Sequence, residues 1–216
     1  MNFDYLFDHW REVLDLTWEH IELCALAIGL ALIFAIPLGI LISAVPRLRF
    51  TTIAILGAIY TIPSLAFLAF LIPVPTLGLG RESAVVVLAA YAQLALVRNM
   101  QTGLTGVDPT VIEAARGTGM TPIQSLMHVR LPLALPVLIA GLRIATVSTI
   151  SLATVTAWIS AGGLGTLLFE GITFNRPSMI LAGTVAITAL ALSADLLLRL
   201  AERLTPASRA LHSAQS

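Results

Sequence analysis

Five long runs of apolar residues dominate this sequence and restrict the folds that it can adopt. The runs lie at about residues 21–45, 51–74, 84–99, 133–158 and 178–200. A helix of about 20 apolar residues crosses the hydrocarbon core of a bilayer. In that core, helices and closed barrels are the structures that pair all their backbone hydrogen-bonding groups. The runs therefore predict an all-α, polytopic membrane protein with about five transmembrane helices.

The composition supports a membrane location. Hydrophobic residues make up 57% of the 216 residues and charged residues 11%, whereas soluble domains average about 25% charged residues. Lysine is absent and the formal net charge is zero, so no bulk attraction to nucleic acid is expected. The single cysteine, Cys24, lies in the first apolar run and is predicted to be a structural thiol without an intrachain disulfide.

The distribution of the arginines predicts the orientation of the chain, because cytoplasmic loops carry an excess of positive charge. One side of the predicted membrane receives Arg47, Arg49, Arg98, Arg116, Arg130, Arg203 and Arg209. The other side receives Arg11, Arg81 and Arg176. We therefore expect the N-terminus outside, the C-terminus in the cytoplasm, and residues 100–132 facing the cytosol.

The chain divides into three parts on this basis. Residues 1–18 are predicted to be an outer-face segment, residues 19–204 the transmembrane domain, and residues 205–216 a cytoplasmic tail. Apolar residues recur at helix-like spacing over 3–18, as in an amphipathic helix that lies on a membrane surface. A loose leader is the other interpretation of that segment. The N-terminus lacks the positive region of a cleavable signal peptide, so the first span is expected to stay.

The segment 105–132 interrupts the apolar runs with a specific local code. Asp108 followed by Pro109 predicts a helix start, and Gly117 and Gly119 predict the end of that helix. The stretch 121–124, Thr-Pro-Ile-Gln, predicts a capping box at the start of a second helix, with Ile123, Leu126 and Met127 on one face. Leu131-Pro132 is expected to end that helix. The loop is thus predicted to be two short helices joined by a tight corner.

The surface of this loop suggests a docking element. Four of its residues have little or no side chain and allow close approach of another protein: Ala114, Ala115, Gly117 and Gly119. Glu113 and Arg116 supply charges that would set the register. Two alternatives are a hairpin that merely links two spans and a DNA-reading helix-turn-helix, and the small number of basic residues disfavours the latter.

The string EAA-x3-G-x9-[Ile/Val]-x-LP in this loop resembles the cytoplasmic EAA loop of ABC importer permeases, with Val129 where that pattern usually has Ile. In that family the loop docks into a cleft on a separate ATPase subunit. The resemblance implies that the ATPase-coupling residues are Glu113, Ala114, Ala115, Arg116, Gly119, Met120 and Thr121. It also implies that ATP and Mg²⁺ bind to the partner ATPase and that this chain holds no cofactor. A P-loop is impossible here because it requires a lysine.

Other stretches resemble the osmoprotectant branch of those permeases: TIPSLAFLAFLIP (61–73), LVRNMQTGLTGVDP (96–109), LPLALPVLIAGLRIATV (131–147) and ISAGGLGTLLFEGI (159–172). The resemblance implies uptake of glycine betaine, choline or carnitine across a bacterial plasma membrane. It implies as partners ABC ATPase subunits, an identical or homologous second permease chain, and an extracytoplasmic solute-binding protein. Import of another small solute, such as an amino acid, is the alternative. A secondary transporter would need membrane-embedded ion ligands and paired repeats, and a membrane scaffold or enzyme would need no ATPase partner.

Polar and aromatic residues within the runs are candidates for a translocation path. In the second run these are Tyr60, Thr61, Pro63 and Ser64, and in or after the fourth run they are Arg143, Thr146, Ser148, Thr149 and Trp158. Pro63 is expected to kink its helix and expose carbonyls. Arg143 either lies beside the path, or ties spans together, or bonds carbonyls of a neighbouring helix. Asp195 and Arg199 are predicted to form an ion pair at i,i+4.

No catalytic or metal site is predicted. The histidines His9, His20, His128 and His212 lack metal-ligand spacing, and Ser64 and His128 lie at different depths, so they cannot act as nucleophile and base. A quaternary ammonium ion is best held by several aromatic faces, which are scarce here. The selective aromatic cage is therefore expected on the separate binding protein, with at most a weak site on this chain.

Overall fold

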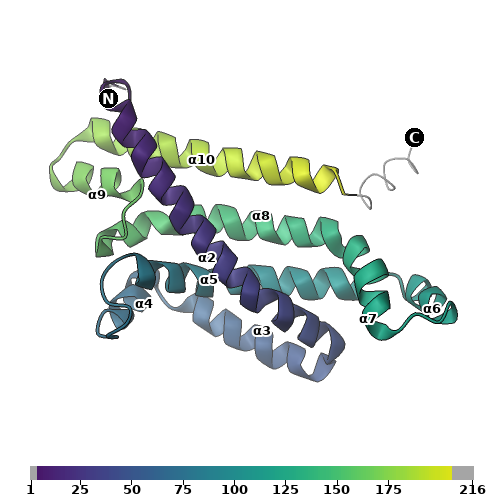
Figure 1. Ribbon diagram of the computed structural model, residues 1–216. Coiled ribbons are helices and arrows are strands. Elements are labelled where there is room, and N and C mark those ends of the chain that lie inside the picture. Colours follow the sequence, from purple (N-terminus) through teal and green to yellow (C-terminus); the bar gives the residue numbers. More distant parts are fainter. Residues whose placement is uncertain (1–3, 206–216) are drawn as a thin grey trace.

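The computed structural model describes residues 4–205, and every regular element in that range is helical, as predicted (Figure 1). The first half contains α1 (Asp4–Asp8), α2 (Trp10–Ala44), α3 (Pro46–Thr61), α4 (Ser64–Leu71) and α5 (Arg81–Thr105). The second half contains α6 (Pro109–Gly117), α7 (Pro122–Ser125), a π-helical turn (Leu126–Arg130), α8 (Leu131–Thr156), a 3₁₀ turn (Ala157–Ile159), α9 (Gly165–Thr173) and α10 (Pro177–Arg203).

The predicted number of spans agrees with these helices. By length and composition, four are able to cross a membrane: α2, α5, the stretch Pro122–Ile159 that contains α8, and α10. The pair α3 and α4 counts as a fifth span if the two are taken together. The helix α5 is longer than the predicted run 84–99, because helical hydrogen bonding continues through the polar residues that follow that run.

The first long helix starts well before the predicted first run. It is continuous from Trp10 to Ala44, so residues 10–18 are neither a separate surface helix nor a loose leader. No proline interrupts the chain before Pro37, and Val13 packs with Leu164, which is fully buried. The α-helix therefore extends out of the apolar run because tertiary contacts hold its first turns.

The second predicted run contains a break instead of a kink. The axes of α3 and α4 differ by 90° across Ile62 and Pro63. Ile62 is extended, with φ −65° and ψ 128°, as expected for a residue that precedes proline. The hydroxyl of Tyr91 donates a hydrogen bond to the carbonyl of Ile62. The break thus exposes a carbonyl, as predicted, and a tyrosine of α5 satisfies it.

The helices place the two ends of the described chain at opposite ends of the bundle (Figure 1). The start of α2, the short helix α4 and α9 lie at one end. The connection between α2 and α3, the pair α6 and α7, and the last turn of α10 lie at the other end. The arginines predicted for the cytoplasm and described in the structure belong to this second end or to the helix turns that lead to it. The alternation predicted from five spans is therefore present.

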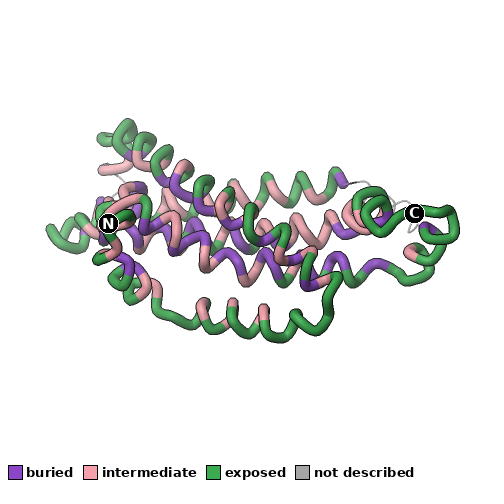
Figure 2. The backbone as a smooth tube through the Cα atoms, turned by 60° about the horizontal axis from the view of Figure 1, so that its bottom comes forward, coloured by how far each residue is buried: buried purple, intermediate pink, exposed green. Residues whose placement is uncertain are grey.

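Helix α5 forms the centre of the bundle and packs against α2, α3 and α8. Its contacts use small residues, which allow close approach between helices in membranes. At Gly39 of α2 an added Cβ would lie 2.6 Å from Met100 Cβ, and at Gly141 of α8 it would lie 2.8 Å from Asn99 Cγ. By contrast, α3 has no buried residue, and Figure 2 shows it as exposed and intermediate along its length. One face of the bundle is therefore left open beside α3.

Candidate functional site

The helix α6 begins with the predicted cap. The Asp108 carboxylate accepts hydrogen bonds from Thr110 N and Thr110 Oγ1, each at 2.8 Å, and Pro109 occupies the first helical position. These two hydrogen bonds stabilise the ionised carboxylate and lower the pKa of Asp108 below its ordinary value. The start of α6 is therefore fixed by local chemistry.

The glycine corner predicted after α6 is present. The helix ends at Gly117, and Gly119 has a φ of +85°, which favours glycine. Gly119 N donates to Arg116 O at 2.9 Å, and Met120 N donates to Ala115 O at 3.2 Å. These two bonds make a Schellman motif, so the chain turns sharply between α6 and α7.

The start of α7 has the predicted capping box. Thr121 N donates to Gln124 Oε1 at 2.8 Å, and Gln124 N donates to Thr121 Oγ1 at 3.3 Å. Pro122 lies at the first helical position. Two backbone N–H groups at the helix start, those of Thr121 and Gln124, are thereby paired.

The prediction that Leu131-Pro132 ends this helix is wrong. The chain passes from α7 through the π-helical turn Leu126–Arg130 directly into α8, and Leu131 N donates to Leu126 O. A π turn uses hydrogen bonds between residues i and i+5, and this wider turn leaves room for a proline that has no N–H. The loop is therefore joined rigidly to the fourth span.

The predicted ATPase-coupling residues gather at the tip of the loop, at the end of the bundle away from α9 (Figure 1). Six of them are exposed: Glu113, Ala114, Arg116, Gly119, Met120 and Thr121. The seventh, Ala115, is buried and packs inside the loop. The tip thus presents two charged side chains, Glu113 and Arg116, beside small residues that leave the backbone accessible.

Two apolar side chains beside the tip were not among the predicted contacts. Ile123 is 74% exposed and Met127 is 55% exposed. Leu126, which the pattern placed on the same face, instead packs inward with Met100, Leu104 and Ala134. Helical spacing alone could not separate the inward residue from the two outward ones, because the separation depends on how α7 rests on α5 and α8.

A groove of about 820 Å³ lies between α3, α5 and α8. Among the predicted path residues, the groove is lined by Tyr60, Ser148 and Thr149. The structure places the others outside its lining: Thr61, Pro63 and Ser64 at the break between α3 and α4, Thr146 on α8, Arg143 against α10, and Trp158 beyond the end of α8.

Helix α5 contributes lining residues that the path prediction left out, among them Tyr91, Arg98 and Asn99. The rings of Tyr60 and Tyr91 have centroids 5.6 Å apart and planes inclined by 60°. The sequence places Tyr60 and Tyr91 in different apolar runs, and the packing of α3 against α5 brings their rings together. This pairing could not be read from spacing along one helix.

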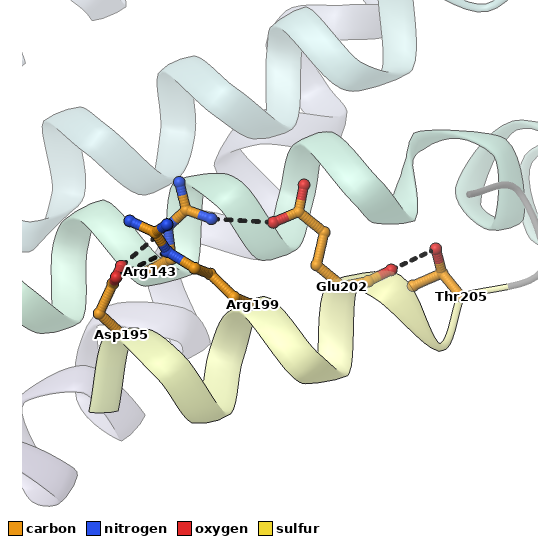
Figure 3. A network of polar contacts seen from close by, with 5 residues as sticks. All are labelled: Arg143, Asp195, Arg199, Glu202 and Thr205. Atoms are coloured by element: carbon orange, nitrogen blue, oxygen red, sulfur yellow. Dashed lines mark hydrogen bonds and ion pairs between the residues drawn. The ribbon is translucent and has the colours of Figure 1, made fainter. Parts of the chain in front are cut away.

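Arg143 ties two spans together, one of the three roles considered for it. Its Nε lies 3.1 Å from Asp195 Oδ1, and its Nη1 lies 3.0 Å from Glu202 Oε2, as Figure 3 shows. Arg199 Nε lies 2.7 Å from Asp195 Oδ2, which confirms the predicted ion pair at i,i+4. The charges of α8 and α10 therefore compensate one another away from the groove.

Polar contacts also join α2 to α8 and to the chain that follows α8, at the end of the bundle that contains α9. Glu19 Oε2 accepts a hydrogen bond from Gly163 N at 3.0 Å, and His20 Nε2 lies 3.0 Å from Ile150 O. Gly162 and Gly163 have φ values of 80° and 79°, so the chain after α8 turns back tightly beside α2. Within residues 4–205, no three His, Cys, Asp or Glu side chains come together in a way that could hold a metal ion.

Comparisons with known proteins agree with this architecture. Residues 27–205 match the family model described as binding-protein-dependent transport system inner membrane component. The chain is 42% identical over 204 residues to the choline transport system permease protein OpuBB of Bacillus subtilis, covering 94% of this chain and 93% of that protein. It is 42% identical to the osmoprotectant import permease protein OsmW of Salmonella typhimurium, covering 94% and 96%. It is 39% identical to the carnitine transport permease protein OpuCB of Listeria monocytogenes, covering 92% and 91%.

A solved structure shows the same fold. A chain of the MetNI methionine ABC transporter, in an inward-facing conformation, superposes with a TM-score of 0.82 at 23% sequence identity, and the match covers 89% of this chain and 95% of that chain. At this identity the likeness speaks for the fold alone. The family match over most of the sequence and the relatives at about 40% identity identify the chain as a member of the binding-protein-dependent transport system inner membrane components, the permease subunits of ABC importers.

Proposed function

We propose that this chain is the membrane-spanning subunit of an ATP-driven importer for quaternary ammonium osmoprotectants such as glycine betaine, choline or carnitine. One observation carries the proposal: relatives that are 39–42% identical over more than nine-tenths of both chains are named as choline, carnitine and osmoprotectant permeases. The methionine transporter shares the fold at only 23% identity. An amino-acid substrate is therefore the less favoured alternative.

The open groove supports a path shared between two permease chains. Helix α3 has no buried residue, and the groove beside it is walled by α3, α5 and α8 on one side. A second permease chain, identical or homologous, would supply the opposite wall. The path would then run between two subunits, with exposed hydroxyl groups such as that of Ser148 facing it.

The loop of α6 and α7 is suited to receive an ATPase subunit. Its backbone is fixed by a cap, a Schellman motif and a capping box, and the tip is exposed. In the proposed orientation this end faces the cytoplasm, because most arginines lie toward it, and the opposite end receives a solute-binding protein. ATP and Mg²⁺ would bind to the separate ATPase, and this chain would perform no hydrolysis.

The mechanism that follows is alternating access. Closure of two ATPase subunits around ATP would move the two docked loops, and each loop is continuous with α8. The spans would tilt and expose the path to the outside, and hydrolysis would return them to the inward-facing packing. ATP binding thus shifts the population between two arrangements of the same helices.

Reconstitution tests this function. A tagged chain would be purified from its native membrane with the subunits that accompany it, and then placed in proteoliposomes with ATP inside and the binding protein outside. We expect ATP-dependent uptake of radiolabelled glycine betaine, choline or carnitine, and no uptake with a non-hydrolysable ATP analogue. Uptake of methionine but of none of the three would contradict the substrate class. Uptake without ATP would contradict the coupling.

A further inference from the structure

We propose that the groove between α3, α5 and α8 is a weak solute site that recognises both ends of a zwitterionic trimethylammonium compound. Tyr60 and Tyr91 would face the cation, and Arg98 would bind the carboxylate. The proposal rests on the proposed function and adds to it a site on this chain that distinguishes betaines from choline. All three side chains line the same groove.

The two tyrosines provide the surface that a trimethylammonium group requires. Such a group donates no hydrogen bond through N–H and is attracted to aromatic faces within about 6 Å of the ring centroid. The two ring centroids are 5.6 Å apart, the ring planes are inclined by 60°, and both residues line the groove, so a cation in the groove would meet aromatic surface from both. The Tyr91 hydroxyl is bonded to the Ile62 carbonyl, so this ring is held in place before a solute arrives.

Arg98 is a cation without a partner in the described part of the chain, where it makes no hydrogen bond or ion pair. Four other arginines of the helical bundle do have partners: Arg81, Arg130, Arg143 and Arg199. Arg98 also borders a second cleft, of about 630 Å³, between α3 and α5. Its position where the two clefts meet places the guanidinium beside an open space, where a planar fork of donors can bind a carboxylate in bidentate fashion.

The spacing of these groups fits a short zwitterion. Tyr91 and Arg98 are separated by two helical turns of α5, a rise of about 10 Å. Side chains on a helix tilt toward its N-terminus, so a long side chain at position 98 can extend toward position 91, and both residues line the groove. Ser148 and Ser151 of α8 face the same groove and offer hydroxyl groups to the solute between its charged ends.

This arrangement predicts different responses from different solutes. Glycine betaine and carnitine carry a carboxylate, whereas choline carries a hydroxyl group. Removal of the Arg98 charge would therefore weaken binding of the two zwitterions about tenfold, as expected for a partly exposed charge-assisted contact. Binding of choline would be unchanged or stronger, because the repulsion between Arg98 and the choline cation would be lost.

Saturation-transfer NMR on the permease–ATPase complex in nanodiscs, without the binding protein, tests the site directly. The N-methyl protons of the solutes report contact, and titration yields dissociation constants. We expect saturation of these protons with the wild-type complex. R98Q should weaken the binding of glycine betaine and carnitine but not that of choline. Y60L or Y91L should weaken the binding of all three solutes. Y91F keeps the ring and loses only the bond to Ile62, so it should retain most of the affinity and show that the fold tolerates the change.

Two matched variants serve as controls. R49Q removes an arginine that lines the neighbouring cleft but not the groove, and F70L removes an exposed aromatic ring outside the groove. Both should bind as the wild type does. The proposed site would be refuted if R98Q weakened the binding of all three solutes equally. It would also be refuted if Y60L, Y91L and R98Q left binding unchanged. Absence of saturation in a complex that imports these solutes would also overturn it, whereas absence of import itself would count against the proposed function.

Discussion

Arg143 of α8 and Asp195 of α10 form an ion pair, with Nε and Oδ1 3.1 Å apart, and this pair joins two helices that are long and apolar enough to span a membrane. The Arg143 guanidinium also reaches Glu202, about two turns farther along α10. Asp195 in turn accepts from Arg199. The arginine thus stabilises a helix contact, and the groove on the other side of α8 does not depend on it.

Substitution D195N tests this ion pair. The loss of the carboxylate leaves Arg143 with Glu202 alone, and we expect the free energy of unfolding to fall by about 1–3 kcal/mol. R199Q removes an arginine side chain that is 56% exposed, so the free energy of unfolding should fall by only about 0–1 kcal/mol. Denaturant unfolding in detergent micelles measures both. A cost for R199Q as large as that for D195N would contradict the central role of Arg143.

Substitution G165A should destabilise the protein strongly. An added Cβ would collide with the Thr154 carbonyl and lie 2.8 Å from Ala157 Cβ. Backbone cannot move aside as a flexible side chain can, so we expect a cost of at least about 1–3 kcal/mol. G29A is the matched control because no atom lies within 4 Å of the added Cβ. The thermal unfolding midpoint should fall for G165A and stay level or rise for G29A.

Substitution G119A should uncouple transport more than G117A does. Both sites have open space around an added Cβ, but only Gly119 has a positive φ. An L-residue there costs about 1–2 kcal/mol of backbone strain and would distort the corner before α7. We expect lower solute uptake per ATP hydrolysed in G119A, with membrane insertion unchanged. Normal coupling in a G119V variant would count heavily against the docking proposal.

Substitution D108A should loosen the first turn of α6. Loss of the N-cap should speed hydrogen exchange in the first turn of α6 several-fold, while D108N should preserve most of the cap. Because the pKa of Asp108 is lowered in the folded state, its contribution is complete above the unfolded pKa of about 3.9. It disappears as the pH falls through the lower folded value. Exchange protection, corrected for intrinsic rates, should therefore stay constant from pH 7 to pH 5, and a loss within that range would refute the assignment.

Local features of this fold were predictable because their causes lie within a few residues. The cap at Asp108, the corner at Gly119 and the capping box at Thr121 each need only neighbours along the chain. The apolar runs likewise predicted the number and alternation of the spans, because a bilayer requires a minimum length of apolar helix. Within the candidate coupling site, the cap, the corner and the capping box are the features that the sequence predicted correctly.

Features that depend on packing were not predictable in the same way. The pair Leu131-Pro132 predicted a helix end, but the π-helical turn before it accommodates the proline and the helix continues into α8. Sequence alone left three roles open for Arg143, because its acidic partners lie on another span. The lining of the groove depends on the packing of α3 against α5, which sets Tyr60 beside Tyr91. The short helix α9 carries too few residues to span a bilayer, so hydropathy gave it no distinct prediction.

The unbroken helical path from Pro122 to Ile159 has a mechanical consequence. Its 38 residues make a lever about 57 Å long. If such a lever swings by about 5° around its midpoint, the rise of 1.5 Å per residue implies that its two tips shift by roughly 2.5 Å in opposite directions. A displacement of this helix at one membrane face would then widen one end of the groove and narrow the other end. No separate hinge within the helix would be needed.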